Sequence, residues 1–131
     1  MKTLVDAGPL VALLNRRDKF HAWVKETLKA LARPLLTCEP VLTQAAQLTG
    51  RPAVFVAMLG EGSLKLGIDL QAQSDPIRRL LERYSPRMSL ADACLVRMSE
   101  MIPGSRVLTL DRVDFSIYRR SGRDVIPLIA P

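Results

Sequence analysis

The beginning of the chain constrains its fold more than any other stretch. Leu4 and Val5 form a short apolar run that predicts a buried strand, and the carboxylate of Asp6 follows directly. Gly8 and Pro9 then break the strand and allow a second apolar run to begin a helix. We therefore expect Asp6 at the carboxyl end of a strand, where open parallel α/β sheets bind their ligands. The alternative is that Asp6 only caps the helix that begins near Pro9.

Length and charge limit the classes of protein that this chain can represent. Its 131 residues predict a single domain over residues 1–131, which buries roughly two-thirds of its unfolded surface without the help of disulfides. Lys and Arg total 19 against 13 Asp and Glu, which gives a net charge of +6. This excess favours a polyanionic partner over an acidic small molecule.

The cysteines and the apolar runs indicate a compartment. Cys38 and Cys94 show neither CxxC nor Cys/His spacing, which argues against a zinc site and a disulfide framework and favours a reducing setting. Asp6 interrupts the first apolar run and no small-residue cleavage pattern follows, so no signal peptide is predicted. No apolar run approaches the roughly 20 residues that span a bilayer. We expect a soluble cytoplasmic protein that has no membrane partner.

Strand and helix patterns alternate after the first strand. Further strands are predicted at 34–37, 64–68, 107–110 and 125–129. Helices are predicted after Pro9, at 20–32, from 39, at 53–59, from 75, from 89 and at 114–118, with a turn at 60–62. This alternation predicts a mostly parallel sheet with helices on both faces. Strand 64–68, which has one solvated side, and strand 125–129, which contains a proline, are expected at its edges.

Two of the predicted helices have distinctive faces. The helix from Ser89 is apolar almost all round and is therefore expected to be largely buried. The helix from Asp75 has one apolar face, and its other face carries Arg78, Arg79 and Arg83. We expect basic helix faces of this kind to hold a nucleic-acid strand.

Carboxylates follow two strands and begin one buried helix. Each has a structural alternative, since Ser89 and Asp92 fit a capping box and Asp111 and Asp114 fit turn and cap positions. However, Asp6 and Asp111 should emerge at the same edge of a parallel sheet, and Asp92 lies in a helix start that is otherwise nearly uncharged. Converging carboxylates repel one another unless a cation lies between them. The cluster therefore predicts Mg²⁺ or Mn²⁺, which can activate water against a phosphodiester.

Other aspartate chemistries fit the sequence less well. A phosphoryl-transferring hydrolase with an Asp-x-Asp pattern would need a second carboxylate at position 8, where this chain has Gly8. A phospho-accepting receiver domain would need a lysine after its last strand, and residues 125–131 contain none. The positive net charge also disfavours a small-molecule phosphohydrolase.

Four segments, taken in order and spacing, resemble the PIN-domain ribonucleases, which include the VapC-type toxins. They are Leu4–Leu10 (LVDAGPL), Leu36–Ala45 (LTCEPVLTQA), Met88–Ala93 (MSLADA) and Leu108–Phe115 (LTLDRVDF). The resemblance covers essentially the whole chain. It implies a three-layer α/β/α sandwich, a carboxylate-bound Mg²⁺ or Mn²⁺, cleavage of RNA, a homodimer and, for a toxin, an antitoxin partner.

The same resemblance assigns the site residues. Asp6, Asp92 and Asp111 correspond to the metal-binding and catalytic aspartates of the family, and Asp114 is a further catalytic candidate. Thr109 is expected to place its hydroxyl near this cluster.

One position departs from the family pattern. The family usually has a glutamate where this chain has Gln44, which is nearly isosteric but neutral and can hold a water or a hydrogen bond beside the metal ligands. Glu39 could compensate for the missing charge, although a cap or surface role fits it better. Two hypotheses follow. The first is a metal-dependent ribonuclease, for which the resemblance includes the toxin of a toxin-antitoxin pair. The second is a PIN-fold RNA- or protein-binding protein with weak or no catalysis.

Overall fold

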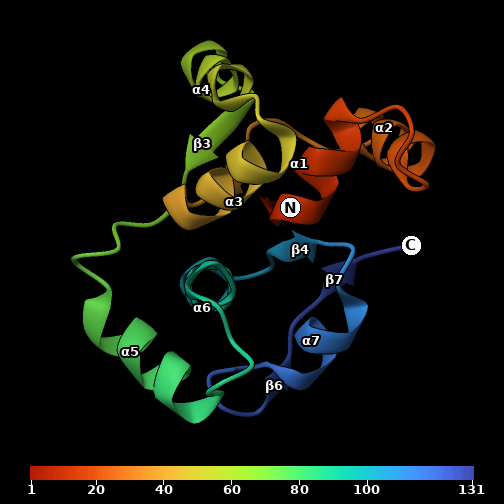
Figure 1. The fold of residues 1–131 in the computed structure, drawn as a ribbon. Coiled ribbons are helices and arrows are strands. Elements are labelled where there is room, and N and C mark those ends of the chain that lie inside the picture. Colours follow the sequence, from red (N-terminus) through yellow and green to blue (C-terminus); the bar gives the residue numbers. More distant parts are fainter.

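A five-stranded sheet lies between two layers of helices in the computed structural model, which describes residues 1–131 (Figure 1). The strands follow the order β3–β2–β1–β4–β7, and every pairing between neighbours is parallel. Their bounds are Thr3–Val5 (β1), Leu35–Thr37 (β2), Leu64–Leu66 (β3), Arg106–Leu108 (β4) and Leu128–Ile129 (β7). The predicted three-layer α/β/α sandwich with a mostly parallel central sheet is confirmed.

Helices cover both faces of the sheet. In Figure 1, α1–α4 lie above it and α5–α7 lie below it. The first layer contains Ala7–Leu14 (α1), His21–Lys29 (α2), Glu39–Thr49 (α3) and Pro52–Glu61 (α4). The second contains Ser74–Arg83 (α5), Leu90–Met101 (α6) and Arg112–Ile117 (α7), together with a small antiparallel hairpin of Arg119–Arg120 (β5) and Asp124–Val125 (β6). None of the helices has the length and apolar character needed to cross a membrane.

The strand order creates a switch point between β1 and β4. The chain moves outward from β1 to β2 and β3, returns to β4 on the other side of β1, and ends at β7. Val5 and Leu108 are register partners, and the Asp6 amide donates to the Leu108 carbonyl at 3.0 Å. Ligands of open α/β sheets bind at the carboxyl ends of strands where the order reverses. Asp6 and Thr109 directly follow β1 and β4, so both lie at this switch point.

The central helix α6 anchors the second layer. Ser89 caps it, and the helix then buries residues on nearly every side, including Leu95 and Met98, which are fully inaccessible. The fully buried Leu4 and Val5 of β1 belong to the same apolar core as Leu95 and Met98. The prediction of a largely buried helix is confirmed. This packing fixes the start of α6 beside the end of β1.

The predicted last strand at residues 125–129 is wrong as a single element. Val125 pairs with Arg119 in the β5–β6 hairpin, whereas Leu128 pairs with Val107 at the edge of the main sheet. Pro127 lies between the two short strands and has no amide hydrogen with which to continue a ladder. The predicted edge position is nevertheless right for β7, as it is for β3.

Other boundaries also differ from the prediction, including α2, which ends at Lys29 rather than at 32, and α7, which covers Arg112–Ile117 rather than 114–118. Strand β4 ends at Leu108 because the Thr109 hydroxyl accepts the Asp111 amide and turns the chain. Strand β3 ends at Leu66, two residues early. The predicted turn at 60–62 is instead the end of α4, which Gly62 terminates with a left-handed φ of 89°.

Candidate functional site

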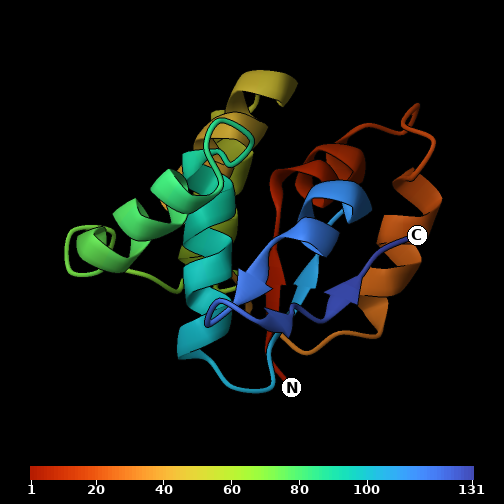
Figure 2. The same cartoon turned by 90° about the horizontal axis from the view of Figure 1, so that it is seen from below.

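A cleft of about 580 Å³ opens at the carboxyl ends of β1 and β4, and we call it the carboxylate cleft. All four predicted aspartates line it, namely Asp6, Asp92, Asp111 and Asp114. Gln44 also lines it, and Arg87 is its single cationic side chain. In Figure 2, β1 rises from the amino terminus towards this end of the sheet, where α1, α6 and α7 begin. The structure thus brings together residues from four distant segments of the chain.

Asp6 is both a helix cap and a wall of the cleft. Its Oδ1 accepts the Ala7 amide at 2.8 Å, and its Oδ2 accepts the Thr109 hydroxyl at 2.8 Å. Only 9% of Asp6 is exposed. Burial raises the pKa of Asp6 to about 6, and repulsion by Asp92 and Asp111 adds to this shift, although the two hydrogen bonds oppose it. Asp6 therefore caps α1 and also lines the cleft, and Thr109 lies where it was expected.

Asp92 is the third residue of α6 and completes the predicted capping box. The Ser89 hydroxyl accepts the Asp92 amide at 3.1 Å, and the Ser89 amide donates to Asp92 Oδ2 at 3.5 Å. The Tyr118 hydroxyl donates to the same Oδ2 at 2.8 Å. Burial is the main cause that raises the pKa of Asp92. Its Oδ1 forms no hydrogen bond within the protein and remains available to a ligand.

Asp111 and Asp114 flank the first turn of α7. Asp111 caps this helix because its Oδ1 accepts the Asp114 amide at 2.9 Å. Burial, followed by interactions with Asp114 and repulsion by Asp92, raises the pKa of Asp111. Asp114 Oδ1 accepts a hydrogen bond from Arg87 Nη1 at 2.6 Å. The turn and cap roles considered for this pair are therefore real, and both carboxylates still line the cleft.

Two residues of the site, Tyr118 and Arg87, were missed from the sequence. Tyr118 is fully buried, and its ring meets the edges of Tyr84 and Phe115 at centroid distances of 5.2 and 5.4 Å. Burial and the hydrogen bond to Asp92 raise the pKa of Tyr118, so the phenol keeps its proton and donates it. The spacing of four residues between Asp114 and Tyr118 is one signal that could have indicated a shared side. Nothing in the sequence distinguished Arg87 from other loop arginines.

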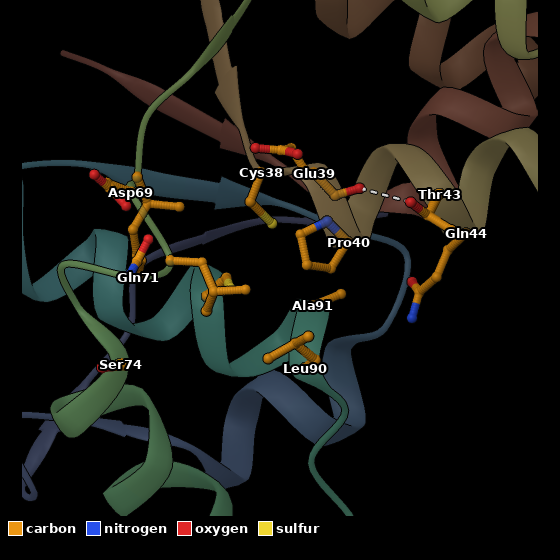
Figure 3. A pocket seen from close by; sticks show the side chains of 13 residues that line it. Cys38, Glu39, Pro40, Thr43, Gln44, Asp69, Gln71, Ser74, Leu90 and Ala91 are labelled. Carbon is orange, nitrogen blue, oxygen red and sulfur yellow. Dashed lines mark hydrogen bonds between the residues drawn. The ribbon is translucent and has the colours of Figure 1, made fainter.

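Gln44 separates the carboxylate cleft from a larger cavity of about 920 Å³ between α3 and α6, which we call the side cavity. Figure 3 shows Gln44 at the end of the side cavity away from Asp69 and Gln71. Glu39 lines only the side cavity, next to Thr43, whose hydroxyl donates to the Glu39 carbonyl at 3.1 Å (Figure 3). Glu39 is exposed and does not replace the missing glutamate charge in the carboxylate cleft.

The carboxylate cleft fits a hard divalent cation in its donor chemistry. As the side chains are arranged, no three of the His, Cys, Asp and Glu residues form a group that could hold a metal ion. Asp6, Asp92 and Asp111 nevertheless offer oxygen ligands of the type that Mg²⁺ and Mn²⁺ prefer. Burial is the main cause that raises the pKa of Asp6, and repulsion by Asp92 and Asp111, which a cation would relieve, adds to it. Side-chain rotation is required to bring the free oxygens of Asp92 and Asp111 together.

Comparison of the sequence with protein-family models gives no match, and comparison with curated proteins gives none either. The resemblance to the PIN-domain ribonucleases therefore depends on the four motifs alone. The geometry adds that the aspartates of three of these motifs, and Gln44 of the fourth, line one cleft.

Proposed function

We propose that the protein is a metal-dependent ribonuclease of the PIN-domain type, which hydrolyses RNA phosphodiester bonds. The observation that carries the proposal is the carboxylate cleft, in which four aspartates from distant parts of the chain meet at the switch point of a parallel sheet. The net charge of +6 supports a polyanionic substrate. A strongly basic protein with an acidic cleft is a suitable combination for a nuclease that uses a cation at its active site.

The four aspartates of the cleft, and the two hydroxyl groups that hydrogen-bond to them, have roles in the proposed reaction. Asp6, Asp92 and Asp111 would hold Mg²⁺ or Mn²⁺, and the bound ion would supply an activated water and a counter-charge for the phosphodiester. Thr109 orients Asp6 through its hydroxyl, and Tyr118 orients Asp92 in the same way. Because the pKa of Asp6 is about 6, this carboxyl is largely ionised at neutral pH and ready to bind a cation. Asp114 acts with these three as a further catalytic carboxylate.

The position of Gln44 favours a second candidate function. Its neutral amide lines the cleft, so the site carries one negative charge fewer than a site with the usual glutamate. A PIN-fold protein that binds RNA or a protein with weak or no catalysis is consistent with this loss of charge.

The resemblance also extends the proposal to partners and compartment. We propose a homodimer in the cytoplasm that an antitoxin protein neutralises, as for VapC-type toxins. The free and buried state of Cys38 and Cys94 supports a reducing compartment. A neighbouring reading frame that encodes a small DNA-binding protein with a disordered tail would support the toxin assignment.

RNA cleavage and RNA binding test the two candidate functions together. The protein is expected to cleave a single-stranded RNA of mixed sequence in Mn²⁺ or Mg²⁺. Cleavage should stop in EDTA and recover when Mn²⁺ is added in excess. Binding to a non-cleavable 2′-O-methyl RNA is expected to weaken steeply with salt, because counterion release contributes most of the affinity. RNA binding without metal-dependent cleavage would favour the binding protein, and binding that does not change with salt would exclude both nucleic-acid functions.

Replacing Gln44 with Glu is expected to tighten Mn²⁺ binding and raise RNA cleavage. The substitution adds one charge beside the carboxylates with almost no change in volume, and a charged interaction of roughly 1–3 kcal/mol corresponds to about 10- to 100-fold in affinity. The metal-free variant should melt at a lower temperature, since a fifth carboxylate increases the repulsion. Calorimetric titration and thermal unfolding with and without Mn²⁺ measure both effects.

Gln47→Glu is the matched control for this change. Gln47 lies on the same helix but is exposed and does not line the cleft. The control should leave Mn²⁺ affinity unchanged. If Gln44→Glu behaves like the control, the side chain at position 44 does not act on the metal site.

A further inference from the structure

A third hollow, of about 370 Å³, lies between α5, α6 and the β5–β6 hairpin, and we call it the arginine hollow. Arg79 and Arg83 of α5 and Arg97 of α6 line it. Its only acidic lining residue is Glu100, which already accepts Arg97 Nη1 at 3.3 Å and the Ser121 amide at 2.7 Å. Three guanidinium groups therefore face one carboxylate, both oxygens of which already accept a hydrogen bond from the protein.

Arg79 and Arg83 keep most of their donors free for a ligand, whereas Arg97 already donates from Nε to Gln73 and from Nη1 to Glu100. Arg83 Nη2 donates to the Gly122 carbonyl at 3.2 Å, and this contact spans from α5 to the hairpin. An arginine has five donors, and this hydrogen bond uses one of those of Arg83. Arg79 forms an ion pair only with Asp75, at 3.2 Å, and an exposed pair of this kind contributes little to stability. The neighbouring Arg78 differs because it lies between Asp75 and Glu82, which neutralise it.

A short span of chain separates the arginine hollow from the carboxylate cleft. Arg83 in the hollow and Arg87 in the cleft are four residues apart, a span of at most about 14 Å of chain. Between them, the Tyr84 ring packs against Tyr118, whose hydroxyl holds Asp92. In Figure 1, α5 and the hairpin both lie below the sheet, and the hydrogen bond from Arg83 to Gly122 joins them. A stacked nucleic-acid strand advances about 3.4 Å per nucleotide, so roughly four nucleotides cover this distance.

We infer that single-stranded RNA crosses from the carboxylate cleft into the arginine hollow, where Arg79, Arg83 and Arg97 bind phosphates about four nucleotides from the scissile bond. The inference rests on the proposed ribonuclease function and names the surface that holds the substrate. Guanidinium groups bind phosphate through paired hydrogen bonds, and such contacts position a strand without reading its bases. Arg87, which is held at the cleft by Asp114 at 2.6 Å, provides the first cationic contact on this path.

The double variant Arg79→Gln and Arg83→Gln tests the inference. Both side chains are exposed, so the fold should be retained, and thermal unfolding checks this. Fluorescence anisotropy with a 2′-O-methyl RNA of 12 nucleotides should show binding weakened by about tenfold or more. The slope of log affinity against log salt should fall by about 1.4, for two phosphate contacts on a single strand. Binding of a three-nucleotide RNA and calorimetric Mn²⁺ affinity should not change.

The double variant Arg16→Gln and Arg17→Gln is the matched control, because it removes the same charge from the exposed connection between α1 and α2 in the other helix layer. It should weaken binding of the 12-nucleotide RNA less than twofold. Equal losses in both double variants, or no loss in the first, would overturn the path through the hollow while RNA binding by the unmodified protein still supports the proposed function. No RNA binding by the unmodified protein, or equal affinity for polyglutamate, would overturn the proposed function itself.

Discussion

Replacing Asp6 and Asp92 together with Asn is expected to abolish Mn²⁺ binding and to lower metal-dependent RNA cleavage by at least about a hundredfold. The two side chains approach the cleft from different elements, and both lose the negative charge that attracts a divalent ion. Asn retains a side-chain oxygen that can accept hydrogen bonds at a helix start, so the helices should still form. Calorimetric titration with Mn²⁺ and a cleavage assay measure the two effects.

The side cavity provides the control for this double variant. Glu39→Gln combined with Asp69→Asn removes the same charge from exposed carboxylates that line the neighbouring cavity rather than the cleft. The control should bind Mn²⁺ as the unmodified protein does. Equal Mn²⁺ affinity in the unmodified protein and in the Asp6, Asp92 double variant would show that the cleft does not bind metal.

Lowering the pH from 7 to 5 is expected to stabilise the metal-free protein. The pKa of Asp6 is raised from 3.8 to about 6 in the folded state. The folded protein therefore binds a proton at the Asp6 carboxyl more tightly than the unfolded chain does. Above pH 6 the folded state therefore carries a cost of about 3 kcal/mol for ionised Asp6, and this cost disappears as the pH falls from about 6 to 4. Between pH 7 and pH 5 the gain from Asp6 alone is about 1.4 kcal/mol. Thermal unfolding in EDTA should show a melting temperature that is higher by several degrees at pH 5.

The Asp6→Asn variant tests the origin of this pH dependence. Since Asn does not ionise, the variant should be more stable than the unmodified protein at pH 7 and should lose much of the gain at pH 5. Asp92 and Asp111 have pKa values raised in the same direction, so a part of the gain should remain. An unchanged pH dependence in Asp6→Asn would show that burial of this carboxyl does not control stability.

The sequence predicts the parallel sheet because its buried strands are short apolar runs that end at turn residues. Leu4 and Val5 before Asp6, Gly8 and Pro9 are the strongest example, and the structure has both the strand and the helix that follows. The C-terminal region is different because strands of two residues show no periodicity. Leu128 pairs with the distant Val107, whereas Val125 pairs with Arg119 in a short hairpin, and neither pairing leaves a periodic pattern in the sequence.

The residues of the candidate site likewise divide into those that a local sequence pattern predicts and those that it does not. The aspartates could be placed from the sequence because each one follows a predicted strand or begins a predicted helix. Tyr118 and Arg87 could not, because they meet Asp92 and Asp114 across 26 and 27 residues of sequence. Contacts over such separations depend on how α5, α6 and α7 pack, which no local pattern describes. Sequence reasoning therefore predicted the aspartates of the cleft, with Thr109 beside Asp6 and Ser89 before Asp92, and missed Tyr118 and Arg87.

The hydrogen bond between Asp6 and Thr109 joins residues that are 103 positions apart. A ribosome that adds roughly 5–20 residues per second therefore makes Asp6 about 5–20 s before it makes Thr109. During that interval the growing chain lacks β4 and α7, so the carboxylate cleft has only part of its wall. Under the proposed function, a growing chain that has not yet reached Thr109 cannot cleave the messenger that encodes it, and chains that terminate before Thr109 never complete the cleft.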